Sequence, residues 1–166
     1  AFIAGAAENG VPRTEDFNGE QQVGAGYYQL TTWNGLRSST AKGYLTSATK
    51  ARPNLLIETN ALASRALFEG NRAVGVEFLQ NGAKMTASAR AEVLLCAGAI
   101  QSPQLLQLSG VGDAALLKKF GIPVVHHAPQ VGKNLQDHLQ IRLSYECTKP
   151  ITTNDQLNSL VGKVAM

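Results

Sequence analysis

A nearly continuous apolar run that ends in glycine decides the fold of this chain: Glu92-Val93-Leu94-Leu95-Cys96-Ala97-Gly98-Ala99-Ile100-Gln101-Ser102-Pro103. The apolar residues 92–97 are typical of a strand that is covered on both faces. Ser102 is a candidate N-cap, and Pro103 suits the first position of a helix predicted over residues 104–109, because its missing N–H leaves nothing unpaired there. A buried strand followed at once by a helix indicates an α/β unit.

The small residues at this junction have two interpretations. Ala97, Gly98 and Ala99 carry no bulky side chain, so a ligand could approach the backbone closely. The free N–H groups and the positive dipole end of the following helix favour phosphate or another anion. Small residues also allow a strand and a helix to pack tightly, and on these residues alone packing is the commoner explanation.

Strand and turn signals precede the apolar run. A first strand is predicted from Leu55 to about Leu67, and residues 73–78 return after a turn at Gly70-Asn71. Asn81-Gly82 is a strong hairpin signal, because both residue types accept positive φ. Together these signals predict antiparallel strands ahead of residues 92–97.

The segment before these strands is irregular and then helical. Residues 9–36 are rich in Gly, Asn, Thr and Gln and predict a long connection, a form that often serves as a lid or binding loop. A helix follows, which Ser38 or Ser39 can cap. It ends at Arg52-Pro53, because the residue before proline is disfavoured in helical conformation.

Short elements follow the apolar run. Asp113 is predicted to cap a helix over residues 114–120, and Gly121 supplies its end. Val124-Val125 and residues 141–145 are predicted to be strands. A last helix is expected to begin near residue 154.

Composition excludes several classes of protein. The chain has 166 residues, enough for one ordinary domain, and 44% of them are hydrophobic. Two cysteines are too few for a disulfide scaffold. The net charge is +3, and the basic residues are too scattered along the chain for a nucleic-acid-binding surface. No apolar stretch is long enough for a membrane span. Charged residues make up only 16%, so much of the surface is expected to face other protein or a large ligand.

Three further motifs do not indicate a cofactor or metal site by themselves. Gly24-Ala25-Gly26 fails as a dinucleotide fingerprint, because no buried strand precedes it. His126-His127 is not expected to bind a metal, because adjacent residues of a strand point to opposite faces. Asp137-His138 can be read equally as an acid–base pair or as part of a hydrogen-bonded turn with Asn134.

Residues 98–112 resemble the second signature of the glucose–methanol–choline oxidoreductases over all 15 positions. Further blocks resemble the same family, in the family's order: residues 16–19, 35–39, 52–55, 72–76 and 131–138. Within the family, the choline dehydrogenase and alcohol dehydrogenase branch is the most similar. The chain starts at Ala1 and stops at Met166 inside an expected helix, so we expect an internal fragment of a longer protein.

The resemblance implies an α+β (α/β) fold. It implies part of a Rossmann-type domain that binds FAD or NAD(P) and carries a β-meander, with pieces of an antiparallel-sheet substrate domain. Residues 1–50 would belong to the lid and substrate side. Residues 51–137 would belong to the FAD-binding domain, and residues 138–166 would begin the return into the substrate domain.

The resemblance also implies the site residues. Ala63 stands where the family, usually with Val, contacts adenine through its backbone, and Ala97, Gly98 and Ala99 match the backbone along the cofactor. No catalytic residue is expected in this chain, because the catalytic His pair should lie beyond Met166. The glycine motif around the FAD pyrophosphate should precede Ala1, so the fragment alone is expected to be inactive.

The implied function is FAD-dependent oxidation of a CH–OH group, with choline or another primary alcohol converted to an aldehyde and hydride passed to flavin N5. The expected partners are the small alcohol and an electron acceptor, either quinone or oxygen. Neither nucleic acid nor a metal is expected. The expected location is the cytoplasm, with attachment to a membrane left open. The alternative is a non-catalytic module of the same fold that binds a nucleotide or a protein partner.

Overall fold

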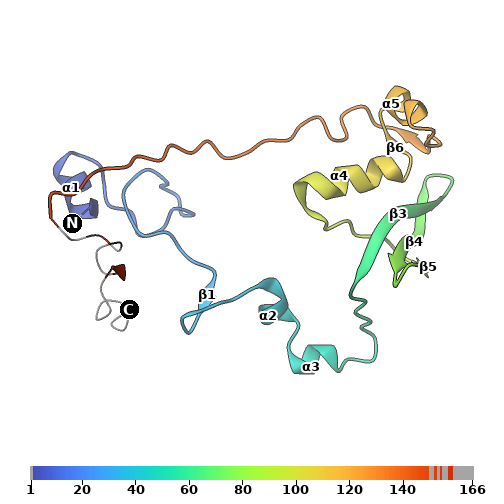
Figure 1. The fold of residues 1–166 in the computed structure, drawn as a ribbon, viewed down its shortest axis with the longest axis horizontal. Helices are drawn as coiled ribbons and strands as arrows, with labels where there is room; N and C mark the ends of the chain where they lie inside the picture. The colour runs from blue at the N-terminus through green and yellow to red at the C-terminus, as the bar shows by residue number, and fades with distance from the viewer. Residues whose placement is uncertain (1, 150–151, 153, 155–156, 159–166) are drawn as a thin grey trace. The chain divides into compact units, whose positions relative to one another are not determined.

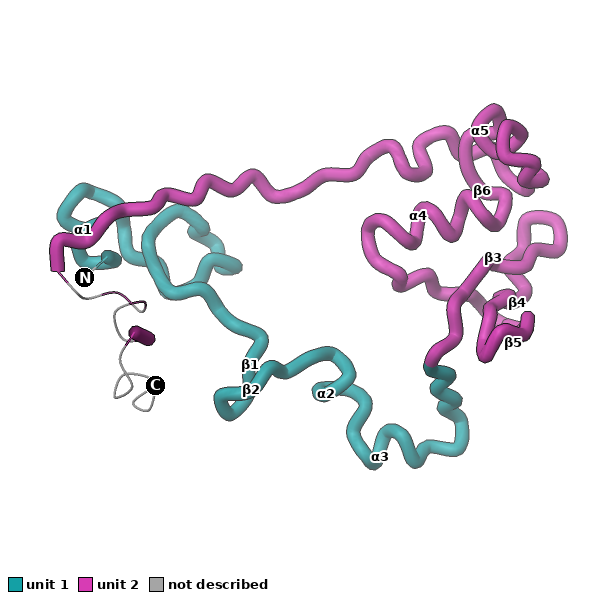
Figure 2. The backbone as a smooth tube through the Cα atoms, viewed as in Figure 1, with its two compact units in different colours: residues 1–59 teal, residues 60–166 magenta. Residues whose placement is uncertain are grey.

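The structure, a computed structural model, describes residues 2–149, 152, 154 and 157–158 (Figure 1). The chain divides into two compact units, residues 1–59 and residues 60–166 (Figure 2). The predicted last helix near residue 154 lies mostly outside the described residues.

The first unit contains short elements separated by irregular backbone. Its members are α1 (Phe2–Glu8), β1 (Thr32–Trp33), β2 (Leu36–Arg37), α2 (Thr40–Tyr44) and α3 (Ser47–Lys50). The single helix predicted after Ser39 is therefore wrong. Ser39 does cap α2, but Thr46 accepts the N–H of Thr49 and starts a second helix. A threonine hydroxyl that satisfies a first-turn N–H favours a new helix start over continuation of the old one.

Gly24 and Gly26 are held against backbone in this unit. A Cβ on Gly26 would overlap the carbonyl oxygen of Thr14, and one on Gly24 would lie 2.7 Å from the carbonyl oxygen of Pro12. Ala25 between them exchanges backbone hydrogen bonds with Pro12 and Thr14. These glycines serve close packing of two chain segments.

The second unit is built on an antiparallel meander in the order β3-β4-β5 (Figure 1). Its strands are β3 (Ala61–Glu69), β4 (Arg72–Gln80) and β5 (Ala83–Ser88). The hairpin predicted at Asn81-Gly82 is confirmed, with φ of 52° and 79° at the two residues. The strand predicted from Leu55 is wrong at its start. Asn60 has φ of 54°, and this left-handed residue breaks the extended chain before β3 begins.

The apolar residues 92–97 do not form a strand, contrary to the prediction. A strand needs a neighbour to pair its N–H and C=O groups, and among the described residues none pairs with this segment. Leu94 is 74% exposed, so the apolar run lacks a cover within the described chain. The prediction that both faces are buried is wrong for this structure.

Helix α4 (Gly98–Leu108) begins five residues before the predicted first position, Pro103. Ser102 is not its N-cap: the Ser102 hydroxyl accepts the N–H of Ala97 at 3.0 Å. Pro103 lies inside the helix. It leaves the hydrogen bond to the Ala99 carbonyl unmade, because proline has no N–H.

The remaining elements are β6 (Val111–Gly112), α5 (Ala114–Lys119) and β7 (His126–His127). The cap at Asp113 is confirmed, since its carboxylate accepts the N–H groups of Ala115 and Leu116. The short strand predicted at residues 124–125 lies instead at residues 126–127, where it pairs in parallel with β6. Residues 141–145 are not a strand.

The core of the second unit lies where α4 packs on β3. Among the described residues, the buried hydrophobic ones are Ala66, Leu105 and Leu117. The described part of the chain holds no helix long and apolar enough to cross a membrane.

Candidate functional site

A cleft of about 270 Å³ lies between β3 and α4, and it brings together two of the four predicted cofactor residues. Ala63 comes from β3 and Ala97 from the N-cap of α4. The remaining lining residues are Ala61, Leu62, Gln101, Gln104, Leu105 and Leu108. Aliphatic walls with two amide side chains suit a flat, uncharged heteroaromatic ring such as a purine.

Ala63 lies beside an irregularity in β3. The register of β3 against β4 shifts between Ala63 and Arg65, so Ser64 has no opposite residue. The Ser64 hydroxyl contacts the carbonyl and the carboxylate of Glu77, each at 3.0 Å. Arg65 donates to the same carboxylate at 3.0 Å. The bulge is thus pinned by side chains next to the predicted adenine contact.

Glu77 is held in its charged form by these neighbours. The hydrogen bond from Arg65, followed by that from Ser64, keeps the pKa of Glu77 below its usual value of 4.5. Most of this carboxylate is covered, with 15% of its side chain exposed, whereas the Arg65 side chain is 53% exposed. The contact orders the edge of the cleft and places no net charge inside it.

Gly98 gives the first turn of α4 an open backbone. Its φ is 88°, a conformation that favours glycine, and a Cβ at this position would meet nothing within 4 Å. The helix has no side-chain cap and no acidic residue in its first turn. The backbone N–H groups in the first turn of α4 and the positive end of the helix dipole therefore suit an anion such as a phosphate.

Ala99 lines a second hollow, of about 580 Å³, on another side of α4. Carboxamide side chains dominate its polar lining: Gln104, Gln107, Gln130, Asn134 and Gln136. Gln104 also lines the first cleft, so this residue lies between the two hollows. Gly98 lines neither, although it stands between Ala97 and Ala99 in the chain.

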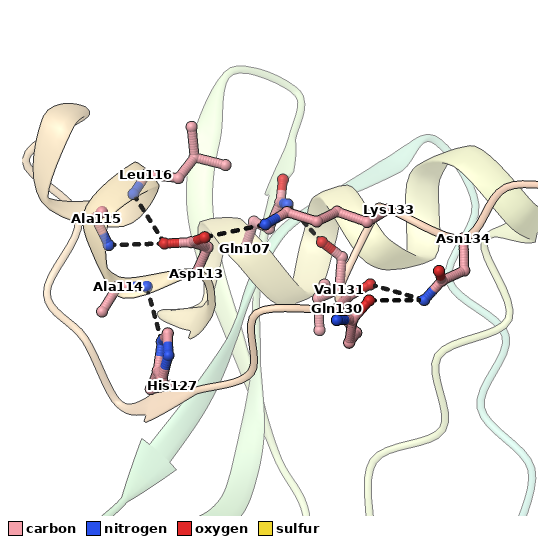
Figure 3. Close-up of polar contacts among 10 residues, drawn as sticks. All are labelled: Gln107, Asp113, Ala114, Ala115, Leu116, His127, Gln130, Val131, Lys133 and Asn134. Carbon is pink, nitrogen blue, oxygen red and sulfur yellow. Dashed lines mark hydrogen bonds and ion pairs between the residues drawn. The ribbon is translucent and has the colours of Figure 1, made fainter.

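Residues 126–134 are hydrogen-bonded to helix α4 and to the start of helix α5 (Figure 3). Gln107 of α4 donates to the carbonyl of Val131 at 3.1 Å, and Lys133 donates to Asp113 at 3.1 Å. His127 Nδ1 accepts the N–H of Ala114 at 3.0 Å. The bond between Gln107 and Val131 holds one wall of the second hollow against α4, and the other two contacts attach the segment to α5.

The Asp113 carboxylate accepts hydrogen bonds from Lys133 and from the N–H groups of Ala115 and Leu116. The hydrogen bond from Lys133, then those from the N–H groups of Ala115 and Leu116, lower its pKa below the usual 3.8. The carboxylate therefore stays charged at neutral pH, and it serves at once as helix cap and as ion-pair partner.

The other motifs of the sequence have local roles. His138 donates its backbone N–H to the Asp137 carboxylate at 2.8 Å, and Asn134 donates to Gln130. This geometry favours the hydrogen-bonded turn over an acid–base pair. His127 Nδ1 accepts a hydrogen bond from the backbone N–H of Ala114. In the described part of the chain, no group of three or more His, Cys, Asp or Glu side chains could hold a metal ion.

Sequence reasoning missed Gln101, Gln104 and Ser109. The two glutamines face the cleft because α4 already begins at Gly98, so residues 101 and 104 share one helical face. Their spacing would have revealed this face if the helix start had been placed correctly. Ser109 contacts a residue 43 positions away, and no local signal announces such a contact.

An antiparallel meander, a helix that starts at an open glycine and an apolar cleft between them define part of an α+β domain of the kind that binds a dinucleotide cofactor. The family model described as GMC oxidoreductase matches residues 1–140. The chain belongs to the GMC oxidoreductase family, and the predicted membership and fold class are confirmed.

Curated relatives lie in the choline dehydrogenase branch. The chain is 57% identical over 155 residues to oxygen-dependent choline dehydrogenase of Citrobacter koseri, with 92% of this chain and 28% of the relative covered. It is 56% identical over 153 residues to the protein of the same name from Stenotrophomonas maltophilia, with 92% of this chain and 27% of the relative covered. The chain thus spans little more than a quarter of the length of these relatives.

Solved structures resemble the chain as well. Pyridoxine 4-oxidase from Mesorbium loti superposes with a TM-score of 0.77 and 36% identity, over 82% of this chain and 27% of that one. An FAD-dependent oxidoreductase from Chaetomium thermophilum reaches a TM-score of 0.53 and 39% identity, over 55% of this chain and 16% of that one. The name of the Chaetomium thermophilum protein includes FAD, which is the cofactor predicted from the sequence.

Proposed function

We propose that the full-length protein is an FAD-dependent oxidoreductase that converts a primary alcohol, with choline as the first candidate, to the aldehyde. The observation that carries this proposal is the cleft between β3 and α4, which unites Ala63 with Ala97 beside the open backbone of Gly98. The 57% identity to a choline dehydrogenase supports choline as substrate.

The residues of this chain would bind and orient the cofactor. Ala63 and Ala97 would form opposite walls for the adenine, with the Gln101 and Gln104 amides available to its polar edge. Gly98 and Ala99 would present backbone to the phosphates, because no side chain fills the space before Gly98. FAD, when bound, supplies the hydride acceptor of the reaction.

The proton acceptor is proposed to lie outside these residues. His127 accepts a backbone N–H, and the backbone of His138 is held by its neighbour Asp137. Neither belongs to the cleft. We assign removal of the alcohol proton to the His pair that the family resemblance implies beyond Met166.

The electron acceptor and the location are part of the same proposal. The curated relatives are named oxygen-dependent, which favours oxygen as acceptor, with a quinone as the other candidate. The protein is proposed to act in the cytoplasm, with attachment at a membrane surface as the variant that would accompany a quinone.

An anaerobic visible spectrum of the full-length protein tests the reaction. We expect a flavin band that bleaches when choline is added, because hydride transfer reduces the flavin. Bleaching by another primary alcohol and not by choline would keep the reaction and overturn the substrate. A protein without a flavin band, even after incubation with FAD, would contradict the proposal and favour a non-catalytic module that binds a nucleotide or a partner.

A further inference from the structure

Ser109 joins α4 to β3 from a buried position. It is 7% exposed, and within the described residues it is the polar residue that is buried. Its hydroxyl accepts the N–H of Ala66 at 2.8 Å and donates to the Leu105 carbonyl. One hydroxyl therefore satisfies an amide of the strand and a carbonyl of the helix.

The amide N–H of Ala66 lies buried in the contact between β3 and α4. Ala66 is paired with Val76 of β4, but its N–H is directed to Ser109. Ala66 is 5% exposed, so water has little access to this group. An unsatisfied buried amide is costly, and the Ser109 hydroxyl therefore fixes where the end of α4 meets β3.

This contact lies next to the part of the cleft that Leu105 and Leu108 line. From Ala61 to Ala66 the strand runs toward Ser109, and from Gly98 the helix runs toward the same residue. The cleft lining ends at Leu105 and Leu108, just before Ser109. The separation between Ala63 and Ala97 thus depends on where strand and helix are joined at Ser109.

We infer that Ser109 is a positioning residue for the adenine half of FAD: it sets the width of the cleft between Ala63 and Ala97 without touching the cofactor. This inference rests on the proposed function, because it assumes that the cleft takes the adenine. The physical basis is preorganisation. A cleft that is held open at one width spends less binding free energy on ordering its walls.

The test compares FAD with FMN, which lacks the adenine half. Both are titrated calorimetrically into the apo form of the full-length protein. We expect Ser109→Ala to raise the Kd for FAD about tenfold, equivalent to about 1.4 kcal/mol, and to leave the Kd for FMN within about twofold. Ser109→Thr keeps a hydroxyl and is expected to restore FAD binding.

Asp113→Ala is the matched control, because it removes the cap of α5 in the same unit while Asp113 lines neither hollow. Its Kd for FAD should stay at the wild-type value. An equal loss of FAD and FMN binding in Ser109→Ala would mean a purely structural role and would overturn the inference, as would an unchanged Kd for FAD.

Two further outcomes are separated by design. If Ser109→Ala does not fold, Ser109→Cys replaces it, because cysteine keeps an atom at the position of the hydroxyl and makes only weak hydrogen bonds. Wild-type protein that binds no FAD would overturn the proposed function itself. Wild-type protein that binds FAD together with an unaffected Ser109→Cys variant would overturn the inference alone.

Discussion

At the scale of single residues, the conformation of Gly98 bears on whether the glycine junction of residues 97–99 serves packing or ligand binding. The residue has φ of 88° and open space where a Cβ would stand. Tight packing, the commoner explanation for small residues at such a junction, would have filled that space. The open backbone supports the interpretation of close ligand approach, since glycine here leaves room that no neighbouring side chain uses.

Gly98→Val is therefore expected to lower FAD occupancy of the full-length protein by about tenfold, because branched atoms would occupy the approach to the backbone. FAD content per purified protein, read from the visible spectrum, measures the effect. Gly121→Val is the control, since Gly121 also has positive φ, 69°, and open space around its Cβ position. Both variants carry the same kind of backbone strain. Equal FAD loss in both would mean that strain alone is responsible.

At the scale of elements, the helix starts decide which residues meet. α4 begins at Gly98, and this start brings Gln101 and Gln104 to the cleft. α5 begins at Ala114, and the carboxylate of its N-cap Asp113 also binds Lys133 and so ties residues 126–134 to the helix (Figure 3). The Asp113 side chain thus caps helix α5 and also binds a residue of the later segment 126–134.

Asp113 predicts a dependence of stability on pH. Its pKa is lowered in the folded state, so its stabilisation is present above the ordinary value of 3.8 and is lost as pH falls through 3.8 toward the folded-state pKa. Asp113→Asn keeps a capping side chain and removes the charge. We expect this variant to lose part of the difference in melting temperature between pH 7 and pH 3 in the full-length protein.

Asp113→Ala removes both the cap and the ion pair and should lower the melting temperature at pH 7 more than Asp113→Asn does. Added salt should narrow the gap between the wild type and Asp113→Asn, because the Lys133 side chain is 54% exposed and its charge is screened. Identical pH profiles for the wild type and Asp113→Asn would contradict the assignment of this pKa shift.

At the scale of the whole molecule, little apolar surface is buried among the described residues. Ala66, Leu105 and Leu117 are the buried hydrophobic residues there, whereas Leu94 and Ile100 are 74% and 71% exposed. Curated relatives are more than three times as long as the matched segment. A core of this size offers little to offset the conformational entropy of the chain.

A polypeptide of just these 166 residues is therefore expected to unfold without a sharp transition and to bind a hydrophobic dye such as ANS. The full-length protein should unfold cooperatively and bind much less dye. Urea titrations followed by circular dichroism, with dye fluorescence at each point, make the comparison. A steep two-state transition of the short polypeptide would show that the described contacts suffice for folding.

Local chemistry explains which predictions succeeded. The Asn81-Gly82 hairpin and the Asp113 cap each depend on residues within a few positions, so the chain itself specifies them. The position of α4 was predicted less well, because Ser102 and Pro103 carry strong start signals that the Gly98 turn overrides. Local signals of similar strength compete at that junction.

The sequence by itself determined the family, the hairpin, the glycine junction and the residue types that a nucleotide cofactor needs. Only the tertiary structure decided that Ala63 and Ala97 line one cleft and that Ser109 joins β3 to α4 beside it, because these contacts join residues about 30 to 40 positions apart. It also decided that residues 92–97 join no sheet in the described part of the chain. An apolar run such as residues 92–97 can form a buried strand only where another strand pairs with it and other elements cover its faces. Those neighbouring strands and covering surfaces come from elsewhere in the molecule.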